Sequence, residues 1–337
     1  MFIQQLRWSR KTTIGVSLVA AAMGLAALVA VLMTGTGGTT IREANAVIDT
    51  GNTAAASGTP KVDYMLDLRT GVTTPLPDPI IVSVANFGRS SHTKYAASRD
   101  GTRLAYVGFG DDENPQIFVT GTDGRAIRQL THDAREAMSP AWSPDGTRIA
   151  YVGYGAKWTG NARHLYVVDV DTGVSARVTG ATGDVWSPQF TRAGTSILYT
   201  GGTASSPVVM IVPAVGGRSR VSLEPDDGLN DTGNASLSPD GSLATFLASG
   251  WPKKEKHHCG PCRFVANADG THRHVLGGEC WGSSPAGTWS PDGRRIVCSD
   301  DINSIVVVDV ATGKTARVAE GQSAIWLDRQ TLLVDVA

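Results

Sequence analysis

The sequence predicts an all-β protein, a six-bladed β-propeller with an N-terminal transmembrane helix. A hairpin motif built around a Ser-Pro-Asp-Gly turn recurs at intervals of roughly 45 to 52 residues, a period typical of propeller blades. A second hairpin motif, which also has glycine in its turn, alternates with the first. Because one four-stranded sheet cannot bury both of its faces alone, such units become stable when they stack around a common axis.

The first hairpin is clearest in residues 141–152. Its turn has proline to pre-set φ, aspartate to cap the turn through its side chain, and glycine at the position that needs φ > 0. A strand rich in apolar and aromatic residues follows the turn. Related hairpins or turns occur at residues 98–107, 191–200, 238–241 and 290–293.

The second hairpin occurs once more often than the first. The chain opens with a second hairpin that lacks a first, whereas residues 326–334 resemble a first hairpin that lacks a second. We expect these two ends to share one blade, in which the C-terminal strands pair with residues 62–76. The propeller then occupies residues 61–337. The six copies are at residues 64–76, 117–131, 165–179, 209–222, 264–276 and 305–319.

The details of the repeat point to a known family. Residues 142–151 combine an aromatic strand end, the turn and a strand ending in tyrosine, and Leu130-Thr131 is an example of the pair that closes a repeat. This pattern resembles the repeats of TolB-type six-bladed propellers, which are WD40-like. The resemblance is weaker in the blade at Thr191, whose turn lacks the proline and the aspartate. It implies the fold, whereas one propeller scaffold hosts many unrelated activities.

Residues 1–33 are predicted to form a cytoplasmic stub and a transmembrane signal-anchor helix. Arg7, Arg10 and Lys11 precede a continuous apolar run over residues 14–33, which is long enough to cross a bilayer. A basic flank stays on the cytoplasmic side of a membrane. We therefore expect a single-pass protein of the cell membrane, with its propeller on the extracytoplasmic side.

The anchor is followed by a segment rich in Gly, Thr and Ala, residues 34–60, which we interpret as a flexible linker. A cleaved signal peptide is the alternative to the anchor. The Ala-Asn-Ala sequence at residues 44–46 has the small-x-small form of a cleavage site, but it lies well beyond the apolar run.

The loops at one end of the propeller carry the longest insertions. This end, which we call the loop face, holds the loops between the second and third strands of each blade and between blades. We expect a ligand to bind there. Its candidate residues are tryptophans in loops, which either anchor a partner or cover their own loop, and a histidine pair. These ligand-face candidates are Trp158, Trp251, His257, His258 and Trp281.

The most distinctive insertion, residues 251–262, ends in Cys-Gly-Pro-Cys. A thioredoxin-type redox site is one interpretation, although that chemistry needs its first cysteine at a helix N-terminus. A metal site that combines Cys259 and Cys262 with His257 or His258 is a second interpretation, but it requires a second half-site. We therefore assign neither a metal nor another cofactor to the predicted site.

The interpretation that we favour for the cysteines is structural. The chain has 4 cysteines, and Cys259, Cys262, Cys280 and Cys298 all fall in or near the seam between the fifth and sixth blades. Outside the cytoplasm, a clustered even set of cysteines indicates disulfides. Three pairings are possible, and we favour links from the 259/262 pair to Cys280 and Cys298.

Composition and motifs restrict the function. The 30 Lys and Arg residues balance 31 Asp and Glu residues, which excludes the basic field that nucleic-acid binding needs. Gly-x-Ser-x-Gly, phosphate-loop and His-Glu-x-x-His motifs are absent from the sequence. We expect a non-catalytic module that binds a protein or another cell-envelope component on the loop face. The alternative is a metal-dependent propeller enzyme that acts on a carbohydrate or a lactone.

Overall fold

The computed structural model describes most of the propeller and none of the N-terminal segment. The described residues are 63–77, 94–110, 114–132, 136–154, 163–180, 184–203, 206–223, 229–250, 259–276, 280, 288–300 and 303–336. All of them belong to one compact unit, Ala46–Ala337. The predicted anchor (residues 1–33) and linker (residues 34–60) lie outside the described residues. The described residues contain no helix that could span a lipid bilayer.

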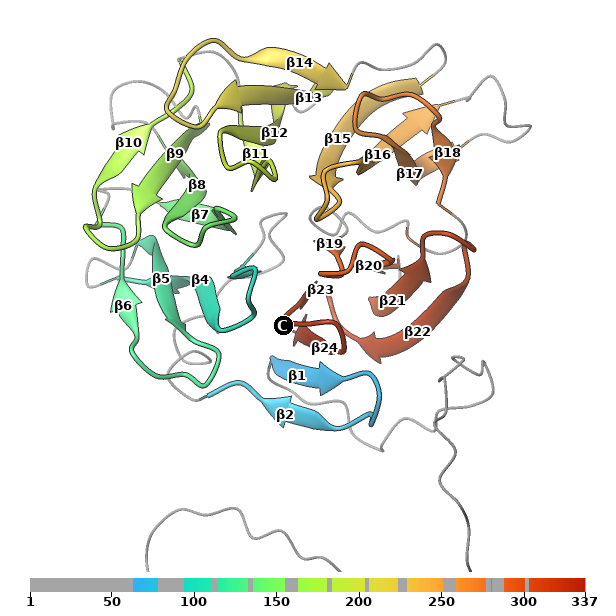
Figure 1. Cartoon of the computed structure of the whole chain (residues 1–337), viewed down its shortest axis with the longest axis horizontal. Coiled ribbons are helices and arrows are strands. Elements are labelled where there is room, and N and C mark those ends of the chain that lie inside the picture. Colours follow the sequence, from blue (N-terminus) through green and yellow to red (C-terminus); the bar gives the residue numbers. More distant parts are fainter. Residues whose placement is uncertain are drawn as a thin grey trace, which may run out of the picture. The chain divides into compact units, whose positions relative to one another are not determined.

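The described residues form six four-stranded antiparallel sheets arranged around an axis (Figure 1). The predicted six-bladed all-β propeller is therefore confirmed. We number the blades from 1 to 6 and give their strands from the axis outwards. Blade 1 contains β23 (Ser323–Trp326), β24 (Thr331–Asp335), β1 (Tyr64–Asp67) and β2 (Thr73–Pro75). Blade 2 contains β3 (Tyr95–Ala97), β4 (Arg103–Phe109), β5 (Pro115–Gly121) and β6 (Arg128–Gln129).

The remaining blades follow in chain order, each from its innermost strand to its outermost. Blade 3 contains β7 (Ala137–Trp142), β8 (Arg148–Tyr154), β9 (Arg163–Asp169) and β10 (Ser175–Arg177). Blade 4 contains β11 (Trp186–Phe190), β12 (Ser196–Thr203), β13 (Ser206–Pro213) and β14 (Arg220–Leu223). Blade 5 contains β15 (Leu229–Leu237), β16 (Leu243–Gly250), β17 (Cys259–Asn267) and β18 (His274–Val275). Blade 6 contains β19 (Thr288–Trp289), β20 (Arg295–Ser299), β21 (Ser304–Asp309) and β22 (Thr315–Glu320).

The Ser-Pro-Asp-Gly turns owe their shape to hydrogen bonds within the motif. In blade 3, the Ser143 hydroxyl donates to the Asp145 carboxylate at 2.5 Å and accepts from the Arg148 backbone N–H at 2.9 Å. Gly146 has a φ of 67°, the left-handed conformation that favours glycine. The bonds from Ser143 and Thr147 lower the pKa of Asp145 to about 2, so its carboxylate is charged at neutral pH.

The apolar core lies between the blades rather than within any one of them. On β5, Ile117 and Val119 pack with Ile149 of blade 3. On the opposite face of the same sheet, Tyr106 packs with Leu333 of blade 1. Since side chains alternate along a strand, each sheet buries one face against the preceding blade and the other against the following blade.

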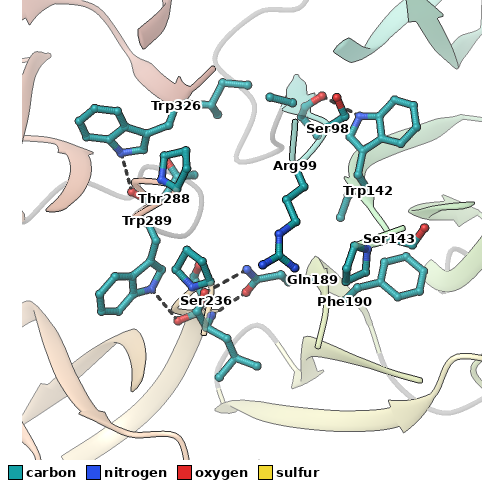
Figure 2. A pocket seen from close by; sticks show the side chains of 18 of the residues that line it. Ser98, Arg99, Trp142, Ser143, Gln189, Phe190, Ser236, Thr288, Trp289 and Trp326 are labelled. Atoms are coloured by element: carbon teal, nitrogen blue, oxygen red, sulfur yellow. Dashed lines mark hydrogen bonds between the residues drawn. The ribbon is translucent and has the colours of Figure 1, made fainter. Parts of the chain in front are cut away.

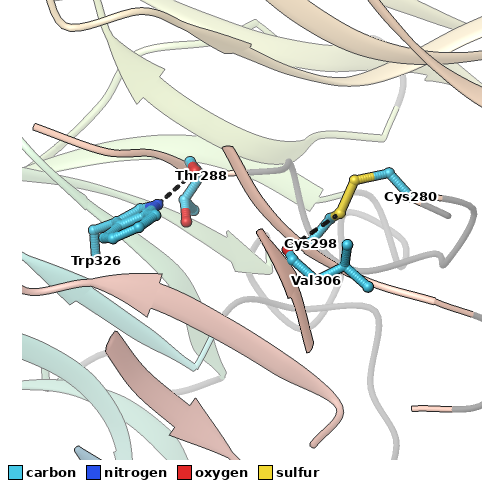
Figure 3. Close-up of a disulfide and its surroundings, with 5 residues drawn as sticks. All are labelled: Cys280, Thr288, Cys298, Val306 and Trp326. Carbon is cyan, nitrogen blue, oxygen red and sulfur yellow. Dashed lines mark hydrogen bonds between the residues drawn. A yellow bond between two sulfur atoms is a disulfide. The ribbon is translucent and has the colours of Figure 1, made fainter. Parts of the chain in front are cut away.

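A disulfide replaces an aromatic pair in the core of blade 6. In blades 2, 3 and 5 an aromatic side chain of the second strand stacks on one from the third strand, as Tyr106 does on Phe118 at 5.5 Å. Cys298 occupies the tyrosine position in blade 6, and it is bonded to Cys280 (Figure 3). The Cα atoms are 5.7 Å apart. Both residues are buried against the apolar seam with blade 5.

The pairing that we favoured from the sequence, with Cys280 and Cys298 each linked to the 259/262 pair, is therefore wrong. Cys280 packs in the apolar cluster that includes Ile296 of blade 6, and Cys298 of the same blade is its disulfide partner. Cys262 is also disulfide-bonded, and no cysteine in the described residues is free. The general expectation of structural disulfides thus holds for Cys280 and Cys298, although their partners differ.

Replacement of both Cys280 and Cys298 by serine should lower the free energy of unfolding by about 2–4 kcal/mol, because this bridge restricts the unfolded chain. The two residues are 18 positions apart in the sequence. Urea unfolding of the oxidised wild type and of the double variant measures the difference. Adding a reductant to the double variant then measures how much the remaining disulfide, at Cys262, contributes to the free energy of unfolding. Superimposable curves for wild type and double variant would contradict the prediction.

The ring closes through a buried polar cluster as well as through strand pairing. β1 pairs with β24 in antiparallel register from Tyr64 opposite Val334 to Asp67 opposite Thr331. At the end of these strands, the Lys94 ammonium contacts the Asp335 carboxylate at 2.8 Å, and both side chains are less than one-tenth exposed. The Tyr95 hydroxyl donates to Asp63 at 2.5 Å. The first and last described strands are thus tied to β3 of the next blade.

Lys94→Met should destabilise the protein by about 3–5 kcal/mol at pH 7.5, because it leaves the Asp335 carboxylate buried without its cation. Burial, followed by repulsion from Asp63, already raises the pKa of Asp335. A carboxyl with a raised pKa favours folding at low pH and loses that advantage as the pH rises. The loss in the variant should therefore be smaller at pH 5 than at pH 7.5 in urea unfolding. Equal losses at both pH values, or no recovery in Lys94→Met/Asp335→Asn, would contradict this account.

Candidate functional site

The six innermost strands surround a cavity of about 350 Å³ on the propeller axis (Figure 2). Its wall is formed by β3, β7, β11, β15, β19 and β23, together with the first residues of the turns that follow them. Each blade contributes residues, so the cavity is a product of the whole ring. It lies towards the ends of the inner strands where the first hairpins turn, which is the end of the molecule opposite the loop face.

Three tryptophans hold neighbouring inner strands together around this cavity. The indole N–H of Trp142 donates to the Ala96 carbonyl of blade 2 at 3.0 Å. Trp289 donates in the same way to Ser236 of blade 5, at 3.1 Å, and Trp326 donates at 3.1 Å to the Thr288 carbonyl of blade 6 (Figure 2). Each indole therefore bridges to the preceding blade. The aromatic strand end of the repeat was visible in the sequence, but its role as a bridge between blades was not.

A glutamine bridges blades 4 and 5. The Gln189 side-chain amide donates to the Leu237 carbonyl at 3.2 Å, and its oxygen accepts from the Leu237 N–H at 2.7 Å (Figure 2). Two hydrogen bonds from one side chain to one residue fix both its position and its orientation. The Gln189 side chain thereby joins β11 to β15 at the wall of the cavity.

Arginines at the start of the second strands form a further set of links, which sequence reasoning missed. The Arg103 guanidinium lies 4.6 Å from the centre of the Trp142 ring and donates to the Gly146 carbonyl at 2.9 Å. Arg148 lies over Phe190 and donates to Gly194 of blade 4 at 3.0 Å. The corresponding residue in blade 6 is Arg295, which lies over Trp326 and donates to the Arg329 carbonyl of blade 1. The available signal was the arginine two residues after the turn glycine, which recurs as Arg103, Arg148 and Arg295 but is Leu243 in blade 5.

Two other arginines give the cavity its charge. Arg99 and Arg192 line it, and no Asp, Glu, Lys or His is among the described residues of its wall. Figure 2 shows Arg99 extending from its turn towards Gln189. Both arginines are exposed, and no ion pair joins either of them to another described residue. The nearby Asp100 carboxylate is held by the Ser98 hydroxyl at 2.5 Å instead.

The position of the two arginines in their turns is informative. Arg99 and Arg192 occupy the second position of the turn, which in blades 3, 5 and 6 is Pro144, Pro239 and Pro291. Proline suits this position because its φ is fixed near −65°, but other residues adopt the same φ. The exchange therefore adds a positive charge to the cavity without changing the path of the backbone.

The ligand-face candidates predicted from the sequence all lie outside the described residues. They are Trp158, Trp251, His257, His258 and Trp281. The Cys259 side chain is likewise not described, and Cys262, Cys280 and Cys298 do not line the axial cavity. In the described part of the chain, no group of three or more His, Cys, Asp or Glu residues is arranged to hold a metal ion. The cavity that the structure describes was not predicted as a site.

Gln189→Ala should lower the free energy of unfolding by about 1–3 kcal/mol, because it leaves the N–H and the carbonyl of Leu237 without their side-chain partner. Gln330→Ala is the matched control, since the Gln330 side chain is on an exposed turn. Guanidinium chloride unfolding of both variants measures the difference. Equal stabilities of the two variants would show that the Gln189 bridge contributes nothing.

Solved structures share the fold. TolB from Acinetobacter baumannii aligns with a TM-score of 0.56 and 15% identity, over 81% of this chain and 63% of that one. A chain in the nidogen/laminin complex aligns with a TM-score of 0.53 and 15% identity, over 81% of this chain and 97% of that one. A puromycin-hydrolyzing peptidase from Mycobacterium tuberculosis aligns with a TM-score of 0.51 and 20% identity, over 76% of this chain and 41% of that one. This chain thus spans less than two thirds of the Acinetobacter TolB structure.

Sequence comparison supplies the family. No curated protein matches the chain. The model of the TolB beta propeller domain, PD40, matches residues 88–259, which is slightly more than half of the chain. Together with the six four-stranded blades, this match shows that the chain belongs to the TolB β-propeller family.

Proposed function

We propose that this protein is a membrane-anchored, extracytoplasmic binding module whose axial cavity receives an acidic segment of a protein partner in the cell envelope. The observation that carries the proposal is the charge of the cavity. Arg99 and Arg192 line a wall in which no described residue is acidic. TolB-like propellers generally mediate protein interactions, which supports a protein as the ligand.

Guanidinium groups favour carboxylates over neutral ligands in such a setting. An arginine presents a planar fork of N–H donors that matches the two oxygens of a carboxylate. Where protein walls reduce contact with water, the attraction between opposite charges is stronger than in bulk solvent. Two arginines on turns of different blades, blade 2 and blade 4, can hold carboxylates from two sides of the cavity.

The size and stiffness of the cavity fit a short segment. A volume of about 350 Å³ takes a few side chains and excludes a folded domain. The bonds from Trp142, Trp289, Trp326 and Gln189 to neighbouring strands hold the wall in place before a ligand arrives. A preformed wall lowers the entropic cost of binding.

The location rests on two features of the chain. The apolar run over residues 14–33 follows three basic residues, which supports a single-pass anchor with the propeller outside the cytoplasm. The Cys280–Cys298 disulfide supports the same side of the membrane, because disulfides persist in oxidising compartments.

The full chain, purified in detergent, should bind a fluorescent seven-residue glutamate peptide at least about tenfold more tightly than the matching glutamine peptide. The double variant Arg99→Pro/Arg192→Pro has the proline that occupies this position in the turns of blades 3, 5 and 6. It should lose the preference for the glutamate peptide without losing stability. Arg69→Ala, which removes an exposed charge from blade 1, should leave that preference unchanged. Fluorescence anisotropy at low and high salt measures the affinities. Equal binding of both peptides, or an unchanged preference in the double variant, would overturn the proposal.

A further inference from the structure

A buried arginine lies in the seam between blades 5 and 6, away from the axial cavity. Arg263 on β17 has 1% of its surface exposed. The strand registers align it with aliphatic residues at the same position of four other blades, all of them fully buried. Those residues are Ile117, Leu165, Val209 and Ile305, each 0% exposed. Blade 5 therefore carries a cation where these blades carry hydrocarbon.

The Arg263 guanidinium has no counter-charge among the described residues. Its Nε, Nη1 and Nη2 atoms are buried, and no described residue accepts a hydrogen bond from any of them. Burial lowers the pKa of Arg263 to about 10, which leaves the group charged at neutral pH. A buried charge without a partner is strongly unfavourable. This position therefore requires a compensating negative charge.

A second polar group on the same face of the sheet is also without a partner. Thr245 on β16 pairs with Val265, two residues along from Arg263, so the three side chains lie on one face. Thr245 is 0% exposed, and its hydroxyl has no hydrogen-bond partner among the described residues. Its counterparts Ala105, Ala150, Leu198, Val297 and Leu333 are all apolar.

This face packs against blade 6. Val265 belongs to the cluster that includes Trp289, Ile296 and the disulfide pair Cys280–Cys298. In blade 1, the residue aligned with Arg263 is Asp63, and it accepts a hydrogen bond across its own seam from Tyr95 of blade 2. The polar residue of blade 1 thus has a partner from the next blade, whereas the side chains of Arg263 and Thr245 have no hydrogen-bond partner among the described residues.

We propose that the seam between blades 5 and 6 binds a small monovalent inorganic anion, chloride in a physiological medium, through the Arg263 guanidinium and the Thr245 hydroxyl. Both groups are hydrogen-bond donors, and an anion accepts from both. One negative charge neutralises the Arg263 guanidinium. The buried, apolar surroundings select an ion of small size over a larger or more strongly hydrated one. The anion stabilises the folded ring because it binds only when both blades are in place.

Thermal unfolding of the full chain in sodium chloride and in sodium gluconate at equal ionic strength tests the proposal. Chloride or bromide should raise the Tm of the wild type by about 2–4 °C over gluconate, which is too large an anion for the seam. Arg263→Leu has an aliphatic residue at this position, as four other blades do, and it should show the same Tm in chloride and in gluconate. In gluconate it should be at least as stable as the wild type. Arg69→Leu should retain the Tm difference between chloride and gluconate.

Two further measurements test the anion site even if Arg263→Leu does not fold. Thr245→Ala should require about tenfold more chloride for half of the Tm rise. Crystals soaked in bromide should show an anomalous peak within hydrogen-bond distance of the Arg263 guanidinium. Equal Tm values for the wild type in chloride and gluconate, or a chloride effect that survives in Arg263→Leu, would overturn the proposal.

Discussion

The need to bury both faces of every blade governs this structure. A four-stranded sheet with apolar side chains on both faces is stable only between two similar sheets, so no blade is independent of its neighbours. The chain meets this need at its ends by placing β1 and β24 in one sheet, which leaves no blade with an uncovered face. The Lys94–Asp335 pair then ties that composite sheet to blade 2.

The same constraint explains where the polar links lie. Side chains near the axis cannot be fully buried between sheets, and there the blades are joined by directional bonds instead of apolar packing alone. Trp142 and Arg103 show how two repeat positions cooperate: the indole bonds to the preceding blade, and the guanidinium of that blade stacks on the indole. Links that close the ring therefore also form the wall of the axial cavity. Stability and a preformed binding surface come from one set of contacts.

Much of the fold could be predicted because the turn motif is local. Ser143, Asp145 and Gly146 specify their hairpin through bonds within a few residues, so their spacing reveals the blades directly. The disulfide partners could not be predicted, because the pairing depends on which face of blade 6 receives the loop carrying Cys280. The axial cavity was missed for a similar reason. Its wall combines one strand from each of six blades, and no continuous stretch of the sequence shows that these strands come together.

The charge of the cavity is placed at positions that the fold does not depend on. In the turn of blade 2, the hydrogen bonds come from Ser98 and Asp100, and Gly101 supplies the positive φ, so the residue between serine and aspartate is free to vary. The turn of blade 4 shows the same freedom: it lacks both proline and aspartate, yet the Gly194 N–H still donates to the Thr191 carbonyl at 2.8 Å. An arginine at this point projects towards the axis at little cost to the hairpin. Variation of this one turn residue can therefore change what the axis binds while the seams between the blades stay intact.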